Sequence, residues 1–188
     1  KEVSGVMEIE IKARCNDEKQ VVKKLLELGA VEEKQKHQID EYYNHPSKDT
    51  KKINEYIRLR YKPGDEKAVF AHHINIADGV NKEFEVGIDN VVVFKDILKN
   101  FGFPLLGTID KKRKTYVLGQ FKITFDEVKD IDNFIEIEVE GEESEIDSKK
   151  AECMGLLEKL GLSEKNLCKG VWLCDIAIGK IKYKKQGA

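Results

Sequence analysis

Five short segments carry two like charges two residues apart, with apolar residues between or beside them. The pairs are Glu8 and Glu10, Arg58 and Arg60, Glu83 and Glu85, Lys111 and Arg113, and Glu136 and Glu138. Side chains at i and i+2 of a strand lie on the same face, so each pair points together. Carboxylates bind hard cations such as Mg²⁺ or Mn²⁺, and arginine and lysine bind phosphate oxygens. Acidic and basic pairs in one cavity would therefore suit a metal–polyphosphate complex.

Two arrangements produce this pattern. Antiparallel sheets with one buried face commonly expose the other face, which is then charged. Alternatively, the sheet closes into a barrel whose charged faces point inward and whose apolar faces pack against helices. The spacing within each pair fits both arrangements.

The elements that must position these charges follow from the residue periodicity. Period-two alternation predicts strands at 8–14, 38–43, 55–61, 68–76, 82–88, 110–118, 121–128 and 134–140. Leu-, Val- and Phe-rich stripes predict helices from Asn16 to Gly29, from Asp89 or Asn90 to Gly102, and over 145–160. The segment 167–181 fits a short helix or a strand. We expect one α+β domain over residues 1–188, built on an antiparallel sheet or barrel.

Composition limits the class of protein. The 188 residues carry a formal net charge of −2, which gives no bulk attraction for nucleic acid. No apolar run approaches the roughly 18 residues of a membrane-spanning helix, and the four cysteines lack zinc-site spacing. We therefore expect a cytoplasmic protein with no nucleic-acid or membrane partner. Met7 is the expected natural start, so residues 1–6 are expected to be an added segment, and 180–188 to form a basic tail.

An ordered set of motifs resembles the CYTH superfamily, the triphosphate tunnel metalloenzymes, and within it the class IV adenylyl cyclase branch. The segment E-I-E-I-K at 8–12 resembles the E-x-E-x-K signature of the family. D-E-Y-Y-N-H-P at 40–46 and I-R-L-R at 57–60 resemble two segments of the cyclase branch. K-E-F-E-V at 82–86, 111–116, D-E-V at 126–128 and F-I-E-I-E at 134–138 follow in the family's order.

The resemblance implies a fold, a reaction class and a metal. The expected fold is an eight-stranded antiparallel barrel that encloses a tunnel and is flanked by helices. Class IV cyclases convert ATP to cyclic AMP and pyrophosphate with Mg²⁺ or Mn²⁺, whereas relatives hydrolyse thiamine triphosphate or inorganic tripolyphosphate. Related barrels are often dimers, so a homodimer is one expected assembly.

The resemblance also implies roles for individual residues. The metal ligands would be Glu8, Glu10, Glu136 and Glu138, supported by Glu83 and Glu85. The phosphate-binding residues would be Lys12, Arg58, Arg60, Lys82, Lys111 and Arg113. The catalytic residues would be Lys12, Tyr43 and Asp126, with Tyr43 near the nucleophile.

One departure from the family pattern bears on activity. Where the family usually has a lysine before its second acidic pair, this chain has His72 and His73. Neutral histidine binds phosphate less strongly than lysine. Three hypotheses follow: a class IV adenylyl cyclase, a triphosphatase on the same scaffold, and a nucleotide- or polyphosphate-binding protein without catalytic activity.

Overall fold

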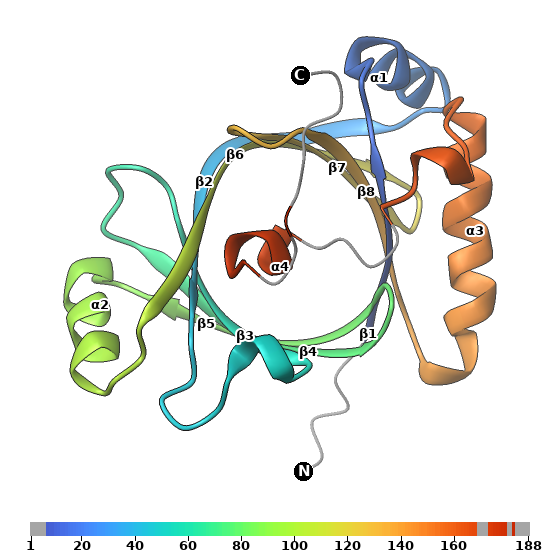
Figure 1. The fold of residues 1–188 in the computed structure, drawn as a ribbon. Coiled ribbons are helices and arrows are strands. Elements are labelled where there is room, and N and C mark those ends of the chain that lie inside the picture. Colours follow the sequence, from blue (N-terminus) through green and yellow to red (C-terminus); the bar gives the residue numbers. More distant parts are fainter. Residues whose placement is uncertain (1–6, 169–172, 180–181, 183–188) are drawn as a thin grey trace.

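The computed structural model describes residues 7–168, 173–179 and 182, and Figure 1 shows its strands as a ring with the longer helices outside and a short helix within. The strands are β1 (Met7–Arg14), β2 (Val31–Tyr43), β3 (Glu55–Tyr61), β4 (Ala68–Ala77), β5 (Val80–Ile88), β6 (Leu105–Leu118), β7 (Phe121–Val128) and β8 (Asn133–Gly141). The helices are α1 (Glu18–Glu27), α2 (Val91–Asn100), α3 (Ile146–Lys159) and α4 (Leu173–Ala177). Among these, no helix has the length and apolar character needed to cross a membrane.

The sheet closes on itself. Its strand order is β1-β5-β4-β3-β2-β6-β7-β8, and every neighbouring pair is antiparallel. β8 pairs with β1 along the whole length of β1, from Met7 to Arg14. β5 closes the other side of β1 through the pairs Glu8–Asn81 and Ile9–Val80. The predicted eight-stranded antiparallel barrel flanked by helices is therefore confirmed.

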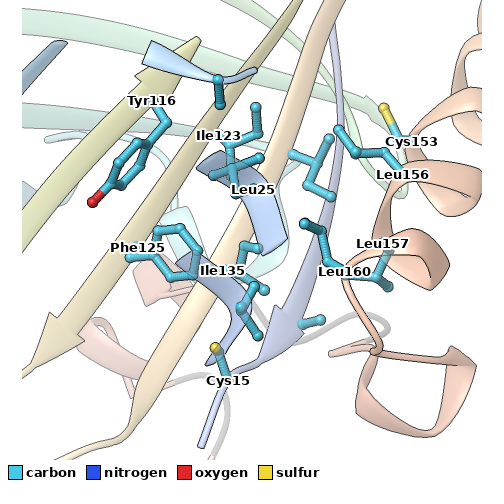
Figure 2. Close-up of a cluster of buried hydrophobic side chains, with 14 of the residues drawn as sticks. Cys15, Leu25, Tyr116, Ile123, Phe125, Ile135, Cys153, Leu156, Leu157 and Leu160 are labelled. Carbon is cyan, nitrogen blue, oxygen red and sulfur yellow. The ribbon is translucent and has the colours of Figure 1, made fainter. Parts of the chain in front are cut away.

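The hydrophobic core lies outside the ring. In β1, Ile9 and Ala13 are fully buried on the outer face, where α1 and α3 cover them. Figure 2 shows Leu25 of α1 and Leu157 of α3 converging on this face. Burying such side chains contributes about 1.5–3 kcal/mol each. This outer packing stabilises the barrel and leaves its inner face to charged residues.

A second outer cluster holds α2. Leu98 packs with Tyr43, Leu59 and Ala68, which belong to the outer faces of β2, β3 and β4. Asn90 caps this helix by accepting a hydrogen bond from the Val93 amide, as its sequence position predicts. α1 begins one residue later than expected, because Asp17 rather than Asn16 accepts the capping hydrogen bond.

The helix α4 lies within the ring in Figure 1, at one end of the barrel. Leu173 and Cys174 pack against Tyr42, Ile109 and other side chains at this end. Of the segment 167–181, which fitted either a helix or a strand, residues 173–177 form a short helix. Gly107 of β6 allows this close approach, since a Cβ atom there would overlap the carbonyl oxygen of Ala177.

The strands β2 and β6 are longer than their sequence pattern predicts, and β6 begins at Leu105 rather than at residue 110. β2 begins at Val31 rather than at residue 38, and its first half pairs with β6 as far as Val117. This half is mostly exposed, so neither face needs apolar residues and the alternation is lost. The predicted segment 1–6 and, apart from Lys182, the predicted tail at 180–188 lie outside the described residues.

Candidate functional site

The inner faces of the strands enclose a cavity of about 200 Å³ whose walls are mostly charged. Because strand side chains alternate, the apolar outer positions force the intervening charged positions inward. All five like-charged pairs reach this cavity. The predicted site residues that line it are Glu8, Glu10, Lys12, Arg58, Arg60, Glu83, Glu85, Lys111, Arg113, Glu136 and Glu138.

Glu8 and Glu10 form the part of the wall with the least cationic compensation. Burial, and then repulsion from Glu138, raises the pKa of Glu8 to about 8. Burial, and then Glu136, raises the pKa of Glu10 to about 7. Glu10 accepts a hydrogen bond of 3.0 Å from the side-chain amide of Asn81. At both carboxyl groups, burial and the neighbouring carboxylates therefore outweigh the nearby cations.

Glu136 and Glu138 instead face cations. A Glu136 oxygen lies 2.7 Å from Lys12 Nζ, and its other oxygen accepts a 2.6 Å hydrogen bond from Arg113. Lys122 donates to both oxygens of Glu138, at 2.8 and 3.0 Å. Although burial opposes ionisation, Lys12 and Arg113 hold the pKa of Glu136 well below its usual value.

Two buried aspartates lie behind the basic wall. Asp126 accepts hydrogen bonds from Arg113, and Asp40 accepts two from Arg60, at 2.6 and 2.8 Å. Lys111 Nζ lies between these aspartates, 3.3 Å from Asp126 and 3.4 Å from Asp40. Burial, and then Arg113, lowers the pKa of Lys111 to about 8. The aspartates thus position the cations whose other side faces the tunnel.

Arg58 and the acidic pair of β5 complete the ring of charges. Arg58 donates to Glu83 at 2.6 Å and to Glu85 at 3.2 Å. His73 Nε2 lies 2.7 Å from Glu83, and burial lowers the pKa of His73 to about 4. His73 is therefore a neutral side chain in the tunnel at neutral pH.

His72 and His73 separate as strand geometry requires. His73 points into the tunnel, whereas His72 lies on the outer side, 2.9 Å from Glu55. His73 stacks on Tyr56 with ring centroids 4.4 Å apart. Tyr56 also makes an edge contact with Tyr42, at 5.6 Å. These rings line the tunnel near Leu173 and Cys174, so the end beside α4 is the least charged part of the cavity.

Tyr43 does not lie in the tunnel, contrary to the expectation that it stands near the nucleophile. It belongs to the outer cluster under α2, and its hydroxyl donates a 2.5 Å hydrogen bond to Glu41. Asp40 and Tyr42 occupy the inward positions of this strand, so the alternation excludes Tyr43.

Lys82 is likewise on the outer face, contrary to the prediction that it binds phosphate. Its neighbours Asn81 and Glu83 both line the cavity, and Lys82 alternates with them. Lys82 Nζ lies 5.5 Å from the centre of the Phe84 ring, which is also turned outward and is 44% exposed. The prediction was based on the position of Lys82 directly before an acidic pair. The alternation along the strand places its side chain on the other face.

The tunnel wall also contains residues that the motif comparison did not select. They are Tyr42, Tyr56, His73, Asn81, Lys122, Leu173 and Cys174. For Tyr56, His73, Asn81 and Lys122, strand parity relative to the charged pairs was an available signal. The residues of α4 gave no such signal, because their position depends on how the chain returns to the barrel.

The donor set suits a hard divalent cation. Glu8 and Glu10 are close enough to other carboxylates for their pKa values to be raised, which a cation beside them would reverse. Among the described residues, no three acidic, histidine or cysteine side chains already form a metal-binding cluster. Glu136 and Glu138 are turned toward lysine and arginine instead. To bind a metal, these two carboxylates would therefore have to release the lysine and arginine side chains and contact the metal instead.

The family model described as "CYTH domain" matches residues 7–170. A curated relative from Methanocaldococcus jannaschii, a candidate adenylate cyclase, is 28% identical over 170 residues, which cover 89% of this chain and 97% of the relative. The structure of the PH1819 protein of Pyrococcus horikoshii is 29% identical, with a TM-score of 0.74, and the match covers 83% of this chain and 91% of that one.

A third similar structure has a description of its activity. It is HpAC1 from Hippeastrum, a candidate adenylyl cyclase described as having a dominant triphosphatase activity. The two chains are 18% identical, with a TM-score of 0.66, and the match covers 91% of this chain and 94% of that one. At this identity the likeness concerns the fold alone.

Proposed function

Since this chain belongs to the CYTH domain family, we propose that it is a divalent-metal-dependent enzyme that hydrolyses triphosphate compounds within its tunnel. The observation that carries the proposal is the facing arrangement of basic and acidic walls. Arg60, Lys111 and Arg113 are held by buried aspartates on one side, and Glu8 and Glu10 lie across the cavity from them.

The basic wall would bind the phosphate chain. Arginine offers paired donors to phosphate oxygens, and lysine adds a compact charge. Arg113 and Arg60 are each fixed by two hydrogen bonds to an aspartate, so little reorganisation is needed when an anion binds. Their charges would also stabilise the phosphate that leaves. We assign Asp126 and Asp40 positioning roles, since both carboxylates contact these cations.

The acidic wall would hold the metal. We propose Glu8 and Glu10 as the primary ligands, with Glu138 and Glu136 joining them, and Glu83 and Glu85 as supporting groups. A bound Mg²⁺ or Mn²⁺ would supply charge stabilisation to the reacting phosphoryl oxygens. Lys12 lies within the acidic wall, because it contacts Glu136 and is close enough to Glu10 to influence its ionisation. It would bind the phosphate nearest the metal.

The side chains that line the charged part of the tunnel favour hydrolysis over cyclisation. Among the described residues that line the cavity, those away from α4 are charged side chains and Asn81, which offer no apolar surface to an adenine ring. Tyr43, the residue expected near the nucleophile, lies outside the tunnel. HpAC1, with its dominant triphosphatase activity, has the same fold.

Adenylate cyclase activity is the second candidate. The Methanocaldococcus jannaschii relative carries that name, and the segment at 40–46 resembles the cyclase branch. In that reaction the ribose 3′-hydroxyl attacks the α-phosphorus and pyrophosphate leaves. The same basic wall would bind the leaving group, so both reactions require the same phosphate-binding residues.

Product analysis tests the proposal. The protein is incubated with ATP, thiamine triphosphate or tripolyphosphate and either Mg²⁺ or Mn²⁺, and orthophosphate, pyrophosphate and cyclic AMP are resolved. Orthophosphate that depends on metal is the expected result. Formation of cyclic AMP and pyrophosphate would show that the protein catalyses cyclisation rather than hydrolysis. Binding of tripolyphosphate without any product would overturn the catalytic assignment and favour a polyphosphate-binding protein.

A further inference from the structure

The end of the tunnel opposite α4 has two oppositely charged sides. Strand direction places the start of β1 and the ends of β5 and β8 at this mouth, with Glu8, Glu85 and Glu140 on the tunnel face. The start of β2 and the end of β3 supply the other side. The tunnel-face residues there are Lys34, Lys36 and Arg60, and Lys62 comes directly after the end of β3.

The register shows that these lysines continue the basic wall. Asp40 pairs with Arg60, so Lys36 lies four residues nearer the mouth on the same face of β2. Lys36 pairs with Arg113 of β6. Lys62 comes directly after the end of β3, two residues beyond Arg60. Successive cations on one face are therefore about 7 Å apart, and the row runs from inside the tunnel to its rim.

The mouth lysines are only partly neutralised, and Lys34 Nζ lies 3.3 Å from a carboxylate oxygen of Glu33. Burial, and then the charges of Lys34, Lys62 and Arg60, lowers the pKa of Lys36, so the four cations are close together. Within the described part of the chain, neither Lys36 nor Lys62 has an ion-pair partner. Outer-face lysines of the neighbouring strand differ, since Lys114 lies 2.5 Å from Glu18. Such a cluster of like charges attracts anions.

We propose that Lys34, Lys36 and Lys62 form a second anion-binding subsite at the tunnel mouth, which holds phosphates of a linear polyphosphate beyond those inside the tunnel. The inference rests on the proposed function, because the tunnel must hold one end of the polyphosphate. The carboxylates on the opposite side repel the emerging chain and direct it along β2 and β3. The preferred substrates are then polyphosphates longer than three units.

Binding measurements with two probes test this subsite. Tripolyphosphate and a long-chain linear polyphosphate are titrated by calorimetry into the wild type and into the double variant Lys36→Ala/Lys62→Ala. The matched control is Lys23→Ala/Lys112→Ala, which removes two exposed lysines from α1 and from the outer face of β6. Circular dichroism checks that the variants are folded.

The subsite predicts a selective loss. The double variant should bind the long chain about tenfold more weakly, whereas its affinity for tripolyphosphate should change less than about twofold. The control should bind both probes as the wild type does. An equal loss in the control would attribute the effect to net charge and overturn the subsite. If the wild type binds neither probe, the proposed function itself fails, whereas tight tripolyphosphate binding with no selective loss rejects the subsite alone.

Discussion

Glu136 of β8 lies 2.7 Å from Lys12 of β1, so a carboxylate expected to bind metal is paired with an ammonium group expected to bind phosphate. Arg113 contacts the same carboxylate at 2.6 Å. Within the tunnel, opposite charges therefore neutralise one another across strands. A metal–triphosphate complex offers a cation to Glu136 and anions to Lys12 and Arg113, so it can replace this internal pairing without leaving buried charge uncompensated.

Replacing Glu8 and Glu10 by glutamine should abolish metal-dependent turnover. Glutamine keeps the shape of each side chain but removes the negative charge that binds Mg²⁺ or Mn²⁺. We expect turnover to fall roughly 100-fold or more, and Mn²⁺ binding, measured by calorimetry, to be lost. Glu127→Gln, on the outer face of β7, is the matched control. Unchanged metal binding in the double variant would reject both residues as ligands.

Tyr43→Phe should leave turnover within about twofold of the wild type, because its hydroxyl lies outside the tunnel. It should lower the free energy of unfolding by about 0.5–1.5 kcal/mol, since Glu41 loses a hydrogen-bond donor. Tyr61→Phe removes another donor from Glu41 and should behave in the same way. Steady-state kinetics and urea unfolding distinguish a structural role from a catalytic one. A large fall in turnover at unchanged stability would show that Tyr43 takes part in the reaction.

Asp40 should make the protein lose stability in acid. Burial opposes its ionisation, but Arg60 and Lys111 hold its pKa well below the usual value. A group with a lowered pKa in the folded state stabilises it above the unfolded-state pKa, about 3.9 for aspartate. That contribution is lost as the pH falls from there toward the pKa of the folded state.

Urea unfolding at pH 5, 4 and 3 measures this loss. The free energy of unfolding should fall more steeply with decreasing pH in the wild type than in Asp40→Asn, which has no proton to gain at this position. Asp65→Asn, in the exposed turn between β3 and β4, is the control and should keep the wild-type slope. Parallel slopes for the wild type and Asp40→Asn would show that other carboxylates cause the loss of stability in acid.

Gly107→Ala should displace α4 from the end of the tunnel. The added methyl group would overlap the Ala177 carbonyl, and such overpacking costs about 1–3 kcal/mol. Gly87→Ala is the matched control, because nothing lies within 4 Å of a Cβ there. The buried thiol of Cys174 should react faster with a thiol reagent in Gly107→Ala, as followed by mass spectrometry of the labelled peptide. Equal labelling of the two variants would show that α4 adapts without opening.

The inner and outer faces of the strands could be predicted because they depend only on local alternation. In a strand, Glu8 and Glu10 lie on one face and Ile9 on the other, however the strand pairs with its neighbours. The same rule, applied strictly, excludes Tyr43 and Lys82 from the tunnel. Both were selected by their place in a motif rather than by their parity along a strand.

The sequence by itself therefore determined most of the strands, the three longer helices, the charge of each strand face and the family. Tertiary structure alone decided that the charged faces enclose a tunnel, because closure requires β1 to pair with both β5 and β8. It also selected the ion partners, such as Glu136 with Lys12, since these depend on register between strands far apart in the chain. The position of α4 depends on packing against Tyr42 and Ile109, which no local periodicity encodes.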